Sequence, residues 1–282
     1  MYTKRTIIGG VLGALLATTA CDKTSRDAGA FTSAGVTHLQ QGENDRAIRD
    51  FDRAIALRPG LVVAWRNRGL AYRSKGDFER ALADYDQATL LAPADARLYV
   101  DRGQVYLATN DHARAIQDFD RAVGMKPDLA VAFEYRGKTN FLLGNLAQAA
   151  ADLQRELSFD STNASVVLWL HVARQRLKQD DAGDFEAQAA RVDSTRWPAP
   201  VIQYFLGSLT LEALRAAAAD TTAAGAKDEG CTVGFYLGEE AIVHGRHDDA
   251  RTLLEETRAN CPKELNEQRA AVAELKRLGA KR

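Results

Sequence analysis

The stretch from Pro59 to Pro93 reads PGLVVAWRNRGLAYRSKGDFERALADYDQATLLAP, and it decides the fold. On both sides of the turn Lys75-Gly76-Asp77, apolar residues recur at intervals of three and four, which is typical of amphipathic helices. Proline lacks the amide hydrogen needed to continue a helix, so each proline marks the end of one unit. The stretch therefore predicts a helical hairpin.

The hairpin repeats every 34 residues, as the spacing of Pro59, Pro93 and Pro127 shows. A glycine, a bulky residue four places before it, an alanine of the second helix and a large core residue recur with the same period. These columns are Gly35, Gly69, Gly103 and Gly137; Phe31, Trp65, Tyr99 and Phe133; Ala47, Ala81, Ala115 and Ala149; and Phe51, Tyr85, Phe119 and Leu153. In period and residue types the pattern resembles the tetratricopeptide repeat (TPR).

The resemblance implies an all-α TPR solenoid of stacked antiparallel helical hairpins, because one hairpin cannot bury its apolar side alone. We expect four regular repeats over residues 28–163. Residues 164–282 are expected to form an irregular, TPR-like helical region. Helices are predicted over 166–177 and 185–192 and from about Val201. They are followed by a surface loop with a helical start over 216–230, a last repeat at 231–264 and a capping helix over 265–278.

A charged column accompanies the repeats. It consists of Arg68, Arg102 and Arg136, and of Asp50, Asp84, Asp118 and Asp152. The arginines could be ligands for an anion. We favour the alternative that each arginine pairs with an aspartate across or between hairpins and fixes their packing, because the charges recur at equivalent positions.

The N-terminus predicts a lipoprotein. Lys4-Arg5 precede an apolar run that is too short to span a membrane, so residues 1–20 are expected to be a signal peptide. The small residues directly before Cys21 resemble a lipobox, although Thr18 stands where leucine is usual. Cys21 is therefore the expected lipidation site, and residues 21–27 are a linker. The alternative is an ordinary signal peptide with a nearby cysteine.

Two cysteines remain, Cys231 and Cys261. In the register of the last repeat, Cys231 opens its first helix and Cys261 closes its second. Antiparallel helices bring those ends together, so a disulfide is expected in an exported chain. The alternative is a pair of buried free thiols.

Composition and motifs give no sign of catalysis. The net charge of −1 does not favour a nucleic-acid binder. We find no metal-binding motif, phosphate loop or activated nucleophile in the sequence, and we predict no enzyme activity, no metal and no cofactor. His244, His247 and Asp248 could share a helix face, but they fall in a turn where exposed polar residues are ordinary.

The expected site is the concave surface formed by the first helix of each repeat. In the TPR register this protein-binding groove is lined by Arg66, Leu70, Arg73, Arg97, Gln104, Leu107, Glu134, Lys138 and Phe141. Its mixed basic and apolar lining suits a helical or extended segment that carries acidic residues.

The irregular half resembles the NlpI family of TPR lipoproteins from Gram-negative bacteria. The resemblance lies in Leu168-Trp169-Leu170 with Ala173 and Leu177, in Trp197 with Tyr204-Phe205-Leu206-Gly207, and in Phe235-Tyr236-Leu237-Gly238 with Gly245. The chain departs from that family in its two C-terminal cysteines, in Asp22, and in the basic end formed by Lys276, Arg277, Lys281 and Arg282.

The resemblance implies a homodimeric adaptor, lipid-anchored and facing the periplasm, on either the inner or the outer membrane. Its implied partners are peptidoglycan hydrolases, notably endopeptidases, and a C-terminal-processing protease, through which it would control cell-wall growth. The alternative is a structural scaffold for envelope protein assembly or secretion that has no hydrolase partner.

Overall fold

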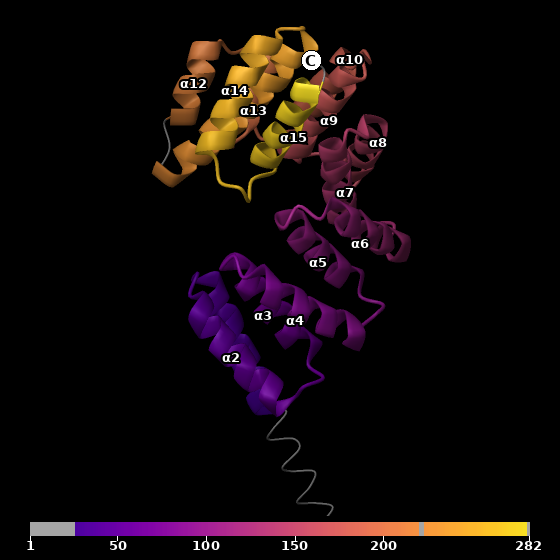
Figure 1. Cartoon of the computed structure of the whole chain (residues 1–282), viewed down its shortest axis with the longest axis vertical. Coiled ribbons are helices and arrows are strands. Elements are labelled where there is room, and N and C mark those ends of the chain that lie inside the picture. Colours follow the sequence, from indigo (N-terminus) through magenta and orange to yellow (C-terminus); the bar gives the residue numbers. More distant parts are fainter. Residues whose placement is uncertain (1–25, 220–222, 281–282) are drawn as a thin grey trace, which may run out of the picture. The chain divides into compact units, whose positions relative to one another are not determined.

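The computed structural model describes residues 26–219 and 223–280 (Figure 1). Helices and short connections make up the whole of this part of the chain, and it contains no strand. The predicted all-helical fold of stacked hairpins is thereby confirmed. The predicted signal peptide, residues 1–20, and the predicted lipidation site, Cys21, lie outside the described residues. The chain divides into two compact units, Met1–Val105 and Tyr106–Arg282.

In the N-terminal unit, a helix over residues 26–40 forms the first hairpin with the helix that follows it. Its other helices are α2 (Asn44–Leu57), α3 (Val62–Ser74), α4 (Phe78–Leu91) and the greater part of α5 (Ala96–Ala108). α3 packs against both α2 and α4. The core consists of Phe51 and Ala47 with the partly buried Phe31 and Trp65, and then of Tyr85 with Val105. All of these except Val105 belong to the repeated columns of the sequence.

The C-terminal unit continues the hairpins. The regular part comprises α6 (His112–Met125), α7 (Ala130–Leu143) and α8 (Leu146–Leu157). The irregular part comprises α9 (Ala164–Arg176), α10 (Ala182–Ala189), α11 (Ala199–Phe205), α12 (Leu211–Ala219), α13 (Ala223–Val243), α14 (His247–Asn260) and α15 (Asn266–Ala280). The helical start predicted for residues 216–230 is present as the end of α12, but the loop predicted to follow it was wrong, because α13 already begins at Ala223. The helix that carries Cys231 therefore begins eight residues earlier than expected.

The repeated glycines allow the helices of a hairpin to approach closely. A Cβ added to Gly35 would lie 2.6 Å from the ring of Phe51, and one added to Gly238 would lie 2.7 Å from Leu254. Neither neighbour is the free end of a flexible chain, since Phe51 and Leu254 are both fully buried. The glycine column therefore marks the close approach of paired helices, and Gly238 has the same role in the last hairpin.

The turns inside the hairpins share one backbone conformation. Gly42, Gly76 and Gly144 have φ angles of 74°, 75° and 84°, and Asn110 has φ 60° at the equivalent place in the third repeat. Lys178 follows Gly144 by one further period and has φ 57°. The backbone period thus continues into the α9–α10 hairpin, where the side-chain pattern has already faded.

The charged column is structural, as expected. Arg68 forms two hydrogen bonds with Asp84 of its own hairpin, at 2.8 and 2.7 Å, and a third with Asp52 of the preceding helix α2, at 2.6 Å. The guanidinium also lies 4.8 Å from the ring centroid of Trp65. Arg68 therefore joins two successive hairpins, as Arg136 does in the C-terminal unit, and the protein itself occupies the donors of both arginines. Repeat one has no such arginine, and His38 binds Asp50 instead, at 2.8 Å.

The core of the irregular part is aromatic. Trp169 of α9 is fully buried, with Phe141 of α7 and Phe235 of α13 each 5.1 Å from it between ring centroids. The indole also packs near Tyr236, at 6.4 Å. Residues more than 90 positions apart in the sequence therefore share one core, which holds the last helices against the regular repeats of this unit.

Candidate protein-binding surfaces

The groove residues of the N-terminal unit lie on α3 and α5, the first helices of repeats two and three. Arg66, Leu70, Arg73, Arg97 and Gln104 are all partly or fully exposed, and we call this set the α3–α5 surface. Two cross-links join its helices, because Arg66 pairs with Asp101 and Arg73 donates to Gln104.

The cross-links modify the predicted chemistry of this surface. Burial alone would lower the pKa of Arg66, but the hydrogen bond and the charge of Asp101 outweigh burial and raise it. Arg66 is therefore already neutralised by Asp101. Arg97 is the exposed cation of the surface, and its backbone amide is bonded to Asp95.

In the C-terminal unit, the expected groove lining needs correction. Leu107 and Phe141 are buried, with 1% and 0% of their surface exposed, so neither can touch a partner. Lys138 is also buried. Its ammonium donates to Glu134 at 2.6 Å and to Ser165 of α9 at 3.2 Å, and it lies 5.8 Å from the ring centroid of Trp169. Later helices cover the part of the predicted wall that α7 forms, since α9 and α15 both pack against α7.

A buried carboxylate lies beside Lys138. Glu156 of α8 is 2% exposed, and Asn163 donates to its Oε1 at 3.0 Å, while its Oε2 has no hydrogen-bond partner among the described residues. Burial raises the pKa of Glu156 to about 7, and the negative charges of Glu134 and Asp160 act in the same direction. This carboxyl therefore titrates near neutral pH.

Helix α15 covers the part of the predicted groove wall that α7 forms. It packs against α7 as well as against α13 and α14. Arg277 of α15 donates to the carbonyl oxygens of Phe141, at 3.2 Å, and of Leu142, and it also pairs with Glu274. Both carbonyls lie in the last turn of α7, where that of Phe141 also accepts from the amide of Gly144 at 2.9 Å, so Arg277 caps the end of this helix.

Arg176 of α9 lies in the same buried network. It contacts Glu239 of α13 at 2.7 Å and Glu274 of α15 at 3.0 Å, and both carboxylates are almost fully buried. Burial, followed by the charge of Glu274, raises the pKa of Glu239. No sequence motif predicted this network. Arg277 was noticed only as part of a basic end, although it has a structural role.

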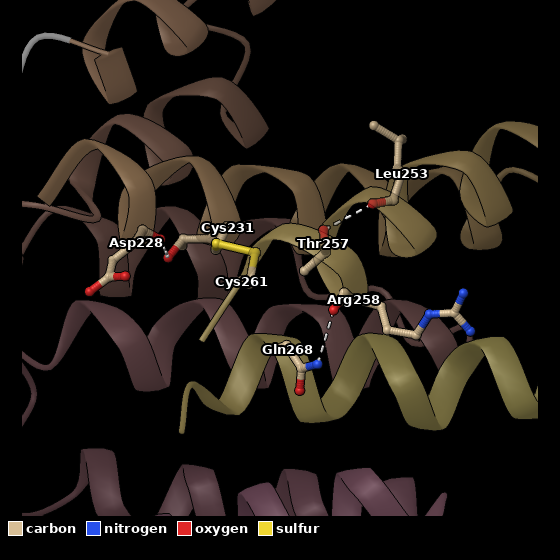
Figure 2. The surroundings of a disulfide bond; sticks show 8 residues. Asp228, Cys231, Leu253, Thr257, Arg258, Cys261 and Gln268 are labelled. Carbon is tan, nitrogen blue, oxygen red and sulfur yellow. Dashed lines mark hydrogen bonds between the residues drawn. A yellow bond between two sulfur atoms is a disulfide. The ribbon is translucent and has the colours of Figure 1, made fainter. Parts of the chain in front are cut away.

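The predicted pairing of Cys231 with Cys261 is confirmed, with a Cα–Cα distance of 5.7 Å (Figure 2). Close by, the hydroxyl of Thr257 donates to the carbonyl of Leu253 at 2.9 Å. Gln268 of α15 donates to the carbonyl of Arg258 at 3.2 Å. The bond joins α13 to the end of α14, and Gln268 then ties α15 to the same place.

Neither a metal site nor a membrane span is found in residues 26–219 and 223–280. These residues contain no group of three or more His, Cys, Asp and Glu side chains that could hold a metal ion. None of their helices combines the length and the apolar character needed to cross a bilayer.

An acid–histidine pair lies in the C-terminal unit. Asp181 binds Nδ1 of the buried His171 at 2.9 Å, and the imidazole stacks on Phe185 with 3.9 Å between ring centroids. His171 and Ser208 both line one pocket of this unit, but the hydroxyl of Ser208 donates to the backbone carbonyl of Gln203 at 2.9 Å. The geometry is that of a packed histidine held by an acid, because the serine is engaged elsewhere.

Comparison with known proteins identifies the repeats. The tetratricopeptide repeat family matches residues 32–96, 66–130 and 100–164. Among solved structures, PilF of Pseudomonas aeruginosa is 16% identical with a TM-score of 0.56, and the match covers 90% of this chain and 99% of that one. The MamA protein is 17% identical with a TM-score of 0.52, covering 66% and 96%.

YrrB, described as a TPR protein with an unusual peptide-binding site, is 17% identical with a TM-score of 0.51, and the match covers 68% of this chain and 97% of that one. At such identities these likenesses establish the fold alone. They agree with an all-helical TPR solenoid.

Proposed function

Because residues 32–164 consist of tetratricopeptide repeats, we propose that this protein is an adaptor that binds other proteins through its α3–α5 surface. The observation that carries the proposal is the arrangement of its charges. The arginines of the repeated column are occupied by aspartates, whereas Arg97 is exposed and Leu70 is partly exposed beside the cross-linked Arg66 and Arg73. An exposed cation near apolar surface suits a partner segment that carries acidic and apolar residues.

We further propose that Cys21 is lipidated and anchors the protein to a membrane of the cell envelope, where it faces the periplasm. The short apolar run before Cys21 supports this assignment, as does the pairing of Cys231 with Cys261, since disulfides persist in oxidising compartments. Anchoring would raise the effective concentration of bound partners for one another.

The proposed partners are peptidoglycan hydrolases and a C-terminal-processing protease, held by a homodimer. This assignment rests on the resemblance of the irregular half to the NlpI family. Trp169 packs against Phe235, so two of the sequence motifs that carry this resemblance lie in one core. Recovery of envelope-assembly or secretion proteins, with no hydrolase, would favour the alternative scaffold function.

The proposal is tested by affinity recovery from envelope extracts. The full chain is compared with the variant Leu70→Ser/Arg97→Glu, and Arg49→Glu serves as a control because Arg49 is an exposed arginine on the second helix α2. We expect the double variant to lose partner recovery by about tenfold or more, and the control to retain it. Equal recovery from all three proteins would overturn the assignment of the surface. A Cys21→Ser chain that stays in the membrane fraction would overturn the anchor.

A further inference from the structure

A pocket of about 870 Å³ opens in the C-terminal unit, apart from the α3–α5 surface. Side chains of α9, α10, α11 and α13 and the segment that joins α11 to α12 form its walls. The volume falls in the range of ligand sites in proteins. The regular repeats contribute no residue to its lining, so it is not part of the predicted groove.

The apolar walls are largely aromatic. They include Phe185, which is buried, and Tyr204 and Phe205, which are half-buried with 5.7 Å between their ring centroids. Leu206 and Leu211 also line the pocket and are 41% and 38% exposed. Large apolar side chains that are exposed at a pocket offer a surface that the stem of a bound side chain can cover.

The charged side chains of the lining are acidic. Glu186, Glu239 and Glu240 line the pocket, and no lysine or arginine does so among the described residues. Glu186 is exposed, and no cation of the described chain lies within ion-pair distance of it. The two histidines of the lining are engaged, since His171 is bound by Asp181 and His244 by the carbonyl of Glu240.

The other two carboxylates are partly compensated. Tyr204 donates its hydroxyl to Glu240 at 3.1 Å, and Arg246 lies 3.8 Å from the same carboxylate. Glu239 is fully buried and paired with Arg176. Glu186 is therefore the uncompensated charge, and Glu240 is the second carboxylate within reach of a ligand. Together they give the pocket a negative potential next to aromatic rings.

We propose that this pocket binds an arginine side chain presented by an extended segment of a partner protein. The inference rests on the proposed adaptor function, to which it adds a second binding site of opposite charge preference. The planar guanidinium can stack on the rings of Tyr204 and Phe205 and donate to two carboxylates, while its alkyl stem covers Leu206 and Leu211. An acidic segment suits the α3–α5 surface, and a basic one suits this pocket.

The test uses fluorescence polarisation with the full exported chain and two labelled peptides. One peptide is acetyl-Ala-Leu-Arg-Leu-Ala, and the other carries citrulline in place of arginine, which keeps the shape and removes the charge. We expect the arginine peptide to bind at least about tenfold more tightly than the citrulline peptide. In Glu186→Gln/Glu240→Gln that preference should fall to less than about threefold.

Glu212→Gln is the matched control, because Glu212 is an exposed glutamate of α12 that does not line the pocket. It should leave both affinities unchanged. Leu211→Ser should weaken both peptides equally, since it removes an apolar contact and no charge. Equal binding of the two peptides, no saturable binding up to about 1 mM, or an equal effect of the control would overturn the pocket assignment. None of these outcomes affects recovery of partners through the α3–α5 surface.

Discussion

The guanidinium of Arg136 forms two hydrogen bonds with the carboxylate of Asp152, at 2.8 and 2.6 Å, and a third with Asp120 of the preceding helix, at 2.8 Å. These bonds raise the pKa of Arg136, with Asp152 as the main cause. Arg68 makes the same three bonds two periods earlier. In repeats two and four, one arginine thus fixes the packing of its own hairpin and joins it to the preceding helix.

Arg136→Met removes the partner of Asp152, which is 6% exposed, and leaves its carboxylate buried and unpaired. We expect a loss of about 2–4 kcal/mol in the free energy of unfolding, measured by urea titration. The double variant Arg136→Met/Asp152→Leu should recover at least half of that loss, because no buried charge remains. If the effects of the two single variants simply add, the pair does not act as a unit.

Two glycines of the helix over residues 26–40 form a matched pair. A Cβ on Gly35 would meet the ring of Phe51, whereas a Cβ on Gly29 has nothing within 4 Å. Gly35→Ala should therefore lower the free energy of unfolding by about 1–3 kcal/mol, since the ring must move. Gly29→Ala should raise it by up to about 1 kcal/mol, because alanine favours the helix. The same sign for both substitutions in thermal unfolding would contradict the close-approach argument.

The sequence predicted the regular part of the fold well, because every repeat carries residues of the same kind at the same spacing. Gly35 and Phe51 recur at fixed spacing, and the hairpins close on their prolines, with α2 ending two residues before Pro59. The pairing of Cys231 with Cys261 was also predicted correctly, although Cys231 lies inside α13 and not at its start.

The candidate site was harder to predict because exposure depends on contacts between distant segments. The position of Phe141 within its repeat gave no sign that Trp169 and Phe235 would bury it. Arg277 lies 135 residues along the chain from Leu142, whose carbonyl it caps, and no local pattern in the sequence predicts that contact. One usable signal was missed, since Lys178 stands one period after Gly144 and takes the same left-handed turn.

The bond between Cys231 and Cys261 closes a loop with a sequence separation of 30 residues. Loop-closure entropy predicts that its loss costs about 3–4 kcal/mol. In Cys231→Ser/Cys261→Ser, hydrogen exchange should speed up in α13 and α14 before it does in α2 or α3. Dithiothreitol should produce the same change in the wild-type chain and none in the variant. An equal response of the variant to the reductant would show that the bond is not the cause.

Glu156 makes stability depend on pH. Its pKa rises from 4.5 in the unfolded chain to about 7 in the fold, so the folded protein holds the proton more tightly. The stabilising contribution of the protonated form is complete below about pH 4.5 and is lost as the pH rises through about 7. Wild type should therefore lose on the order of 2–3 kcal/mol between pH 5 and 8 that Glu156→Gln does not lose.

The glutamine keeps the acceptor for Asn163 and carries no charge, so the variant should be the more stable protein at pH 8. Glu79→Gln, at an exposed position of α4, should keep the wild-type pH dependence. Parallel curves for wild type and Glu156→Gln would show that this carboxyl is not the titrating group.

Site-specific photo-crosslinking in intact cells tests the adaptor surface most directly. A benzoylphenylalanine is placed at Leu70 or Arg97 on the α3–α5 surface, or at Arg49 on α2, and the cross-linked proteins are identified by mass spectrometry. We predict that the first two positions capture the same envelope protein, a peptidoglycan hydrolase or a processing protease, and that Arg49 does not. Capture of that protein from Arg49 alone, or of nothing from Leu70 and Arg97, would contradict the account.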